Sequence, residues 1–106
     1  MYNVSIVIPA FNEGQRLPDF IGKLVAEIDK TSFSVEVVVV DDGSSLEHKK
    51  NYRELMQNAS RKYVRLIEND INAGKGAALK QGLLSSQGKG IGSDTLMLME
   101  RFRPKR

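Results

Sequence analysis

The most constraining feature of the sequence is a run of valines that ends in two neighbouring carboxylates. Residues 35–40 read Val-Glu-Val-Val-Val-Val, and Asp41, Asp42 and Gly43 follow directly. A run that is apolar almost throughout, without alternation, is typical of a strand buried on both faces of a parallel sheet. Successive side chains on a strand point to opposite faces, so we expect both carboxylates to leave the core at the carboxyl end of this strand. In an open α/β sheet, this end holds the ligand crevice.

The same residues also fit a purely structural role. Gly43 suits a turn, and Ser44 with Glu47 three residues later has the spacing of a capping box for the following helix. In this interpretation the segment is a strand end, an acidic turn and a helix cap. The motif alone supports a ligand site and a structural turn equally.

Strand patterns and helical patterns alternate along the rest of the chain. A clear helical stripe covers residues 17–28, where apolar residues recur at i, i+3, i+4, i+7, i+8 and i+11. Strands are expected at residues 4–10, 35–40, 63–68 and 95–99, and further helices at residues 52–63 and 77–85. This alternation implies parallel βαβ units with right-handed crossovers. Since the valine-rich strand needs cover on both faces, we predict an α/β fold of three layers, α/β/α, with a parallel sheet.

The composition is ordinary for one small globular domain. The 106 residues are 41% hydrophobic and 27% charged, and none is cysteine. No disulfide or thiolate metal site can therefore form, which suits a reducing compartment. No stretch approaches the roughly 20 apolar residues that span a bilayer. Residues 4–11 are apolar but lack the basic leader and cleavage site of a signal peptide. We therefore expect a cytoplasmic protein without a membrane span.

The net charge of +3 comes from the end of the chain. Four of the 16 basic residues lie at residues 101–106, so the first 100 residues carry 12 Lys and Arg against 13 Asp and Glu. A nucleic-acid-binding surface needs clustered basic residues with interleaved aromatic ones. The body of the chain offers no such cluster, and we expect no nucleic-acid partner.

Three segments together resemble one known family. They read VSIVIPAFNE at residues 4–13, VVVDDGS at 38–44 and NAGKGAAL at 72–79. In this order and spacing they are similar to motifs of the family 2 glycosyltransferases, which are inverting enzymes with the GT-A fold. Residues 16–18 (Arg-Leu-Pro) and 74–76 (Gly-Lys-Gly) resemble the dolichyl-phosphate glucosyl- and mannosyltransferase branch most closely. The resemblance covers residues 4–88 and implies the N-terminal, Rossmann-like nucleotide-binding half of a GT-A domain.

This resemblance implies a nucleotide site across the carboxyl ends of the first two strands. Asp42 would accept a hydrogen bond from the base, Asp41 would support the turn or the ribose, and Phe11 would stack on the base. Glu13 would fix the ribose or base region, and Lys75 would contact the nucleotide beside a helix N-terminus, whose free N–H groups favour anions. The full set of expected nucleotide-binding residues is Pro9, Ala10, Phe11, Glu13, Asp41, Asp42 and Lys75.

Several of these residues also have a plain structural interpretation. Phe11 can cap the core, Glu13 can be a solvated turn residue, and Lys75 can be an exposed lysine of a loop. The only histidine, His48, is expected to lie exposed on the second helix without a chemical role. These alternatives stay open at the level of sequence.

The sequence departs from the family pattern where a metal site is expected. Family members carry an Asp-x-Asp motif after the fourth strand, and its carboxylates hold the Mg²⁺ or Mn²⁺ that neutralises the leaving diphosphate. This chain has Glu100-Arg101-Phe102 there, and phenylalanine cannot bind a metal. We therefore expect no catalytic residue and no metal ligand in this chain. We expect a nucleotide-sugar-binding part at residues 1–88, a divergent and poorly ordered tail at residues 89–106, and a truncated chain that is inactive alone.

In the full-length enzyme, the resemblance implies hexosyl transfer from a UDP-glucose or GDP-mannose type donor to an acceptor such as a polyprenyl phosphate, at the cytoplasmic face of a membrane. Two other classes remain. A phosphate- or dinucleotide-binding module would carry G-x-x-x-x-G-K-[ST] or G-x-G-x-x-G, and neither occurs here. A non-catalytic interaction fragment would pair, for example with itself, through the exposed sheet edge of the first strand.

Overall fold

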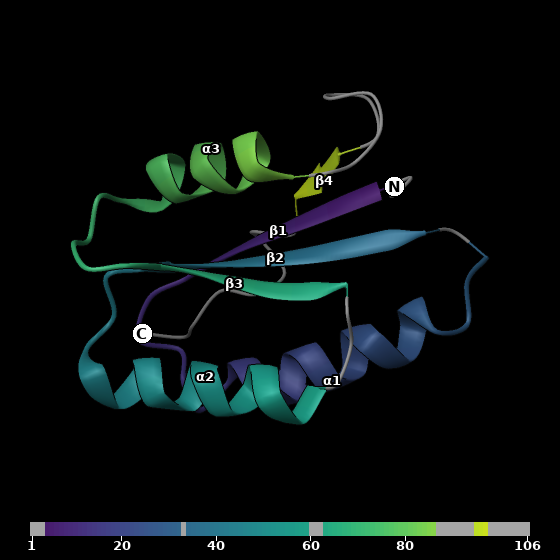
Figure 1. Ribbon diagram of the computed structural model, residues 1–106, viewed down its shortest axis with the longest axis horizontal. Helices are drawn as coiled ribbons and strands as arrows, with labels where there is room; N and C mark the ends of the chain where they lie inside the picture. Colours follow the sequence, from purple (N-terminus) through teal and green to yellow (C-terminus); the bar gives the residue numbers. More distant parts are fainter. Residues whose placement is uncertain (1–3, 33, 60–62, 87–94, 98–106) are drawn as a thin grey trace.

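The computed structural model describes residues 4–32, 34–59, 63–86 and 95–97. In these ranges strands and helices alternate from the first element to the last (Figure 1). The strands are β1 (Val4–Ala10), β2 (Val35–Asp42), β3 (Val64–Asn69) and β4 (Thr95–Met97). The helices are α1 (Leu17–Ile28), α2 (Leu46–Ala59) and α3 (Lys75–Ser85). The predicted order is confirmed, but α2 begins well before the apolar stripe at residues 52–63, near the helix start that the spacing of Ser44 and Glu47 indicates.

The strands form one parallel sheet with the order β3-β2-β1-β4. Helix α3 covers one face of this sheet, and α1 and α2 cover the other (Figure 1). The predicted three-layer α/β/α fold with a parallel sheet is therefore confirmed. With β2 and β1 at its centre, the sheet brings the ends of these two strands to a common edge.

Strand β2 divides its side chains between two hydrophobic cores, and all eight of its residues are buried. Val37 and Val39 belong to the larger core under α1 and α2, whereas Val38 and Val40 belong to the smaller core under α3. The absence of alternation in the sequence follows from this double burial. The larger core consists of Ile6, Ile8, Ala10, Leu17, Ile21, Val25, Ile28, Val35, Val37, Val39, Tyr52 and Val64.

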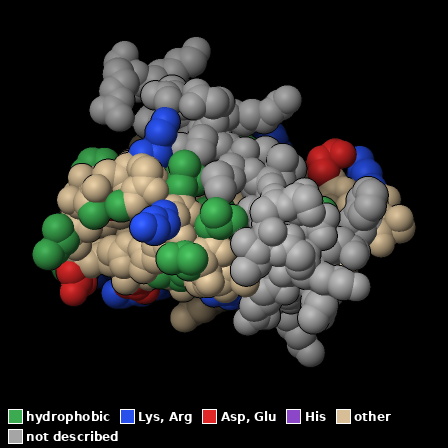
Figure 2. Space-filling view, turned by 90° about the horizontal axis from the view of Figure 1, so that it is seen from above, with side chains coloured by type: hydrophobic (Ala, Val, Ile, Leu, Met, Phe, Trp, Pro, Cys, Tyr) green, Lys and Arg blue, Asp and Glu red, His purple; other side chains and the backbone are tan. Residues whose placement is uncertain are grey.

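Helix α3 lies close to the sheet because small residues face it. Ala78 and Gly82 are its buried residues. A Cβ atom at Gly82 would lie 2.4 Å from Cγ1 of Val7 and 3.0 Å from Cγ2 of Val40, so glycine permits the close approach. The outer side of the helix is mixed, and the view from above shows hydrophobic and basic side chains together on this face (Figure 2).

The expectation that both carboxylates leave the core is wrong. Strand β2 continues past Val40, and Asp41 and Asp42 stay in register opposite Glu68 and Asn69 of β3. Their side chains are 0% and 4% exposed, and they point to opposite faces of the sheet. Two neighbouring carboxylates can remain in a strand because each finds its own hydrogen-bond donors, as described below.

Two further expectations need correction. The Ser44 hydroxyl does not cap α2, because it accepts a hydrogen bond from the Asn12 N–H and pairs with the Tyr52 hydroxyl. The first strand is not an edge, since β1 pairs with β2 on one side and with β4 on the other. The outer strands of the described sheet are β3 and β4, so β1 is not the exposed edge strand on which the expected self-association depends.

Some predictions fall on parts of the chain outside the described residues. Glu100, Arg101 and Phe102 lie there, as does most of the predicted tail at residues 89–106. The division at residue 88 thus stays a prediction. Among the helices of the described ranges, none is both long and apolar enough to cross a membrane.

Candidate functional site

Three segments that are distant in the sequence meet at the carboxyl edge of the sheet. Ala10, at the end of β1, lies opposite Asp41 of β2. The loop after β3 reaches the same place, where its Ala73 N–H donates to Asp42. In a parallel α/β sheet this edge is the usual position of a ligand site. The predicted site segments at residues 9–13, 41–42 and 72–75 are therefore brought together.

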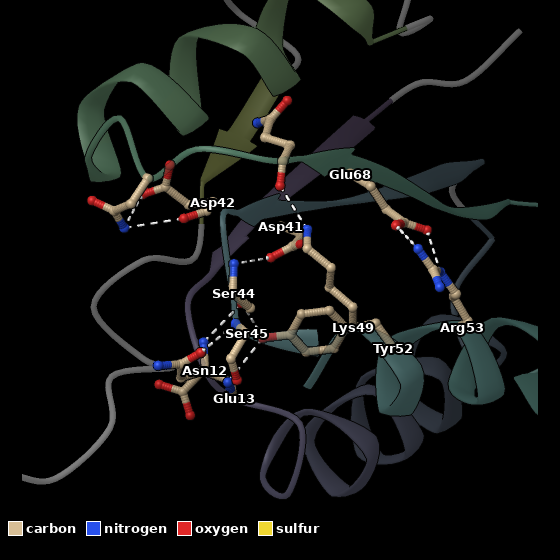
Figure 3. A network of polar contacts seen from close by, with 12 residues as sticks. Asn12, Glu13, Asp41, Asp42, Ser44, Ser45, Lys49, Tyr52, Arg53 and Glu68 are labelled. Atoms are coloured by element: carbon tan, nitrogen blue, oxygen red, sulfur yellow. Dashed lines mark hydrogen bonds and ion pairs between the residues drawn. The ribbon is translucent and has the colours of Figure 1, made fainter. Parts of the chain in front are cut away.

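Asp42 holds the loop that leads into α3. Its Oδ1 accepts from the Ala73 N–H at 2.9 Å, and its Oδ2 accepts from the Gly74 N–H and from the Asn72 side-chain amide, both at 3.1 Å. The Asn72 amide also donates to the backbone oxygen of Asp42 at 3.0 Å. Hydrogen bonds to an ionised acceptor are stronger than neutral ones. The carboxylate thus anchors residues 72–74, on the side of the sheet that carries α3 (Figure 3).

Asp41 points to the opposite face and is tied to the start of α2. Its Oδ1 accepts from the Ser44 N–H at 2.9 Å, which closes the turn after β2, and its Oδ2 forms an ion pair with Lys49. The Lys49 ammonium also donates to the backbone oxygen of Asn69 at 2.6 Å. Lysine and aspartate are 11% and 0% exposed, so this is a buried pair. It joins β2, α2 and the end of β3 (Figure 3).

The loop between β1 and α1 docks onto the turn before α2 through Asn12. The Asn12 N–H donates to the Ser44 hydroxyl at 2.9 Å, and the Ser45 N–H donates back to Oδ1 of Asn12 at 3.0 Å. Asn12 has a φ of 53°, in the left-handed region that asparagine tolerates better than most residues. This conformation turns the chain sharply at the site edge, directly after Phe11.

The next two residues of this loop are held by side chains of α2. The Glu13 N–H donates to the Tyr52 hydroxyl at 2.8 Å, and the Gly14 N–H donates to Nδ1 of His48 at 2.9 Å. Tyr52 is fully buried, and this burial raises the pKa of its phenol above the ordinary value. His48 is half-buried, so the expectation that it lies exposed is wrong. Three successive backbone N–H groups, at residues 12–14, therefore have side-chain acceptors.

The seven predicted site residues differ in how accessible they are. Phe11 is 43% exposed, and Lys75 is exposed at the first position of α3. Glu13 is only 4% exposed, which contradicts its interpretation as a solvated turn residue. Asp41 and Asp42 are buried as described above, Ala10 is buried and Pro9 is half-buried. The exposed Phe11 ring follows β1 directly, at the same edge as Asp42, and does not cap the core.

Sequence reasoning missed several residues that shape this edge. Lys49, Tyr52 and Asn72 were given no role at the site, although each bonds to an acidic or backbone group there. Tyr52 fitted the apolar stripe of the second helix, and a stripe gives no information on the partner of a hydroxyl. Asn72 lies inside the NAGKG motif, two residues before Gly74. This position was the available signal for a role of Asn72 at the site.

The described residues contain no cluster of ligating side chains that could hold a metal ion by itself. No group of three or more His, Cys, Asp or Glu side chains lies together in the ranges that the structure describes. Asp41 and Asp42 point to opposite faces, and their oxygens are engaged by Lys49 and by loop 72–74. These two carboxylates cannot act as a metal-binding pair in this arrangement, and we assign no Mg²⁺ or Mn²⁺ ligand to them.

The fold is that of an α/β protein whose parallel strands end at one common edge, and comparison with known proteins identifies the family. The model of glycosyl transferase family 2 matches residues 5–97. The chain therefore belongs to glycosyltransferase family 2.

Individual relatives agree with this assignment. The dolichyl-phosphate β-glucosyltransferase of Homo sapiens is 36% identical over 93 residues, which are 83% of this chain and 29% of that protein. The enzyme of the same name from Dictyostelium discoideum is 33% identical over 91 residues, which are 81% of this chain and 28% of that protein. The chain thus spans less than a third of the length of these curated relatives.

A solved structure supports the fold. The mannosyltransferase PcManGT from Pyrobaculum calidifontis, in complex with GDP-Man and Mn²⁺, superposes with a TM-score of 0.61 at 24% identity. The match covers 81% of this chain and 25% of that protein. The described sheet and helices therefore correspond to part of a GT-A glycosyltransferase domain.

Proposed function

We propose that this chain is the nucleotide-sugar-binding part of a family 2 glycosyltransferase. The donor would be of the UDP-glucose or GDP-mannose type, and the full-length enzyme would transfer the hexose, with inversion, to a polyprenyl phosphate. The names of the relatives support this choice of acceptor, since two of them are dolichyl-phosphate β-glucosyltransferases. The GDP-Man complex of the structural neighbour supports a nucleotide-sugar donor.

The observation that carries the proposal is the meeting of three segments at the carboxyl edge of the sheet. Phe11 offers an exposed ring at the end of β1, and Asp42 offers a carboxylate at the end of β2. Lys75 offers a cation at the first position of α3, where the helix dipole also favours anions. A base, a ribose and a diphosphate need these three kinds of group in one place.

We assign no group of this chain to the chemical step. A phosphate acceptor is already a nucleophile at neutral pH, so transfer to it needs no strong general base. A divalent cation would supply charge neutralisation at the leaving diphosphate, but the described carboxylates do not fit such a site. We therefore expect that residues 1–106 alone bind the donor without transferring its sugar. We also expect the full-length enzyme to act at the cytoplasmic face of a membrane.

Calorimetry tests the proposal directly. UDP or GDP should bind the chain weakly, and Asp42→Ala should abolish the binding. Asp70→Ala is the matched control, because Asp70 is an exposed carboxylate of the loop after β3. The proposal fails if neither nucleotide binds the wild type, or if Asp42→Ala binds as well as Asp70→Ala does.

A further inference from the structure

We propose that Asp42 is a positioning residue that fixes loop 72–74 and the start of α3 before any ligand binds. The anchoring itself follows from contacts within the chain. Its consequence for ligand binding rests on the nucleotide site proposed above. In that site the Asp42 side chain would contact the base. Because it also fixes the loop that leads into α3, it would strengthen the binding of the diphosphate as well.

The number of acceptor positions on the carboxylate allows both roles. An ionised carboxylate has about four lone-pair positions on its two oxygens. Asn72, Ala73 and Gly74 occupy three of them, one on Oδ1 and two on Oδ2. One position on Oδ1 remains for an N–H of a base or an O–H of a ribose. Asp42 can therefore receive a ligand without releasing the loop.

A second observation shows that the loop is seated against the end of β2. Gly43 has a φ of 74°, and a Cβ atom there would lie 2.3 Å from the Asn72 nitrogen and 2.5 Å from the carbonyl carbon of Ile71. The backbone at residues 71–72 thus packs directly on the turn after Asp42. Gly74 has a φ of 103°, which turns the chain into α3 immediately after the anchored residues.

The body of α3 is held by other contacts. The side-chain amides of Asn69 and Gln81 exchange two hydrogen bonds, at 2.6 and 3.1 Å, and these join the end of β3 to α3. Gly82 packs on Val7 of β1. Loss of the Asp42 carboxylate should therefore loosen residues 72–74 and leave the helix docked, so its variants should fold.

Different substitutions separate the two roles of Asp42. A residue that only contacts the base changes the affinity for a nucleoside and for its diphosphate by the same factor. A residue that also positions the loop weakens the diphosphate further, because Lys75 and the first N–H groups of α3 follow directly on the anchored residues. Asn72→Ala loosens the same loop but leaves the Asp42 carboxylate in place, so it should affect the diphosphate selectively.

The anchoring is tested first on the ligand-free chain, by NMR measurement of amide hydrogen exchange. Asp42→Asn and Asn72→Ala should speed exchange at Ala73 and Gly74 by roughly tenfold to hundredfold, since charge-assisted bonds are lost. Exchange at the central strand residue Val39 should not change. Asp70→Ala should leave all of these rates unchanged. Equal rates at Ala73 and Gly74 in wild type and Asp42→Asn would overturn the anchoring.

The positioning role is tested by the affinities of uridine and UDP, and of guanosine and GDP, for the same variants. Asn72→Ala should weaken the diphosphate about tenfold and leave the nucleoside unchanged, whereas Asp42→Asn should weaken both, the diphosphate more. An equal loss for nucleoside and diphosphate in both variants would overturn the positioning role. If the wild type binds none of these ligands, the proposed function fails, and the exchange rates alone then decide the anchoring.

Discussion

The buried ion pair between Asp41 and Lys49 gives a sharp prediction for the stability of the carboxyl edge. In Lys49→Met the apolar stem of the side chain is retained, but Asp41 keeps only the Ser44 N–H as a donor while it remains 0% exposed. Removing one partner of a buried pair costs about 3–5 kcal/mol, because the other charge is left uncompensated. Lys49 is 11% exposed, so solvent relieves little of this cost. We expect a loss of about 3 kcal/mol in the free energy of unfolding.

Urea unfolding followed by circular dichroism measures this loss. For a chain of this size the melting temperature should also fall by roughly 12 °C or more. The matched control is Lys50→Met, since Lys50 is the next residue of α2 and is exposed. Substitutions at exposed positions usually change stability by no more than about 0.5 kcal/mol. The reasoning is refuted if Lys49→Met and Lys50→Met have the same midpoint and slope in urea.

A double-mutant cycle separates the pair from other effects of each substitution. Asp41→Asn leaves the Lys49 ammonium without its counter-ion, whereas Asp41→Asn with Lys49→Met leaves no uncompensated charge. The double variant should therefore be more stable than the sum of the single losses predicts, with an interaction energy of about 1–3 kcal/mol. Additive losses would show that the two side chains stabilise the protein independently.

Three further predictions concern the helices and the contacts around them. Gly22 of α1 has open space around it, so Gly22→Ala should raise the free energy of unfolding by about 1 kcal/mol through helix propensity. At Gly82 the same gain is outweighed by an overpacking penalty of about 1–3 kcal/mol. Urea unfolding should therefore shift in opposite directions for Gly22→Ala and Gly82→Ala, and shifts of the same sign would contradict the packing of α3. Tyr52→Phe removes the acceptor of a buried backbone N–H and should cost about 1–3 kcal/mol. Because burial raises the pKa of Tyr52, its contribution to stability is full below the ordinary tyrosine pKa and is lost as pH rises through the higher folded value. The free energy of unfolding, measured at increasing alkaline pH, should fall less steeply with pH for Tyr52→Phe than for the wild type. An identical dependence on pH would count against the buried phenol. Hydrogen bonds from Arg53 hold the pKa of Glu68 below its ordinary value. Arg53→Met should raise this pKa in an NMR titration of the Glu68 carboxyl group, and the small stabilisation by the pair should disappear as pH falls through the folded pKa. An unchanged titration would show that the two side chains do not pair in solution.

The sheet was predictable from sequence because its signal is local. Strand 4–10 has the same limits in the sequence pattern and in the structure, and the stripe at residues 17–28 coincides with α1. Burial on two faces explains both the valine run and the position of β2 within the sheet. The apolar period does not show the start of α2, since its polar first turns carry none; only the spacing of Ser44 and Glu47 indicates a helix start there. These first turns are fixed by the docked loop at residues 12–14.

The contacts of the site depend on pairs of residues far apart in the chain, and periodicity carries no information on them. Asn12 and Ser44, Glu13 and Tyr52, and Gly14 and His48 are separated by more than thirty positions. Each pair joins the loop after β1 to the turn after β2 or to α2. Hydrophobic pattern predicts that the segments meet at one edge, but not which donor meets which acceptor. For this reason the sequence predicts the edge at which the acidic pair lies, but not that both carboxylates are buried there.

The acidic pair can serve both a structural turn and a ligand site, because the two carboxylates face different layers. Asp41 binds Lys49 and the Ser44 N–H on the side of α2, and its side chain is 0% exposed. Asp42 accepts hydrogen bonds from loop 72–74 at three of its about four lone-pair positions, and one position remains. Ordering a loop when a ligand binds costs free energy, so a loop that is anchored beforehand favours binding. A nucleotide at this edge would therefore gain from the structural bonds of Asp42 as well as from its free position.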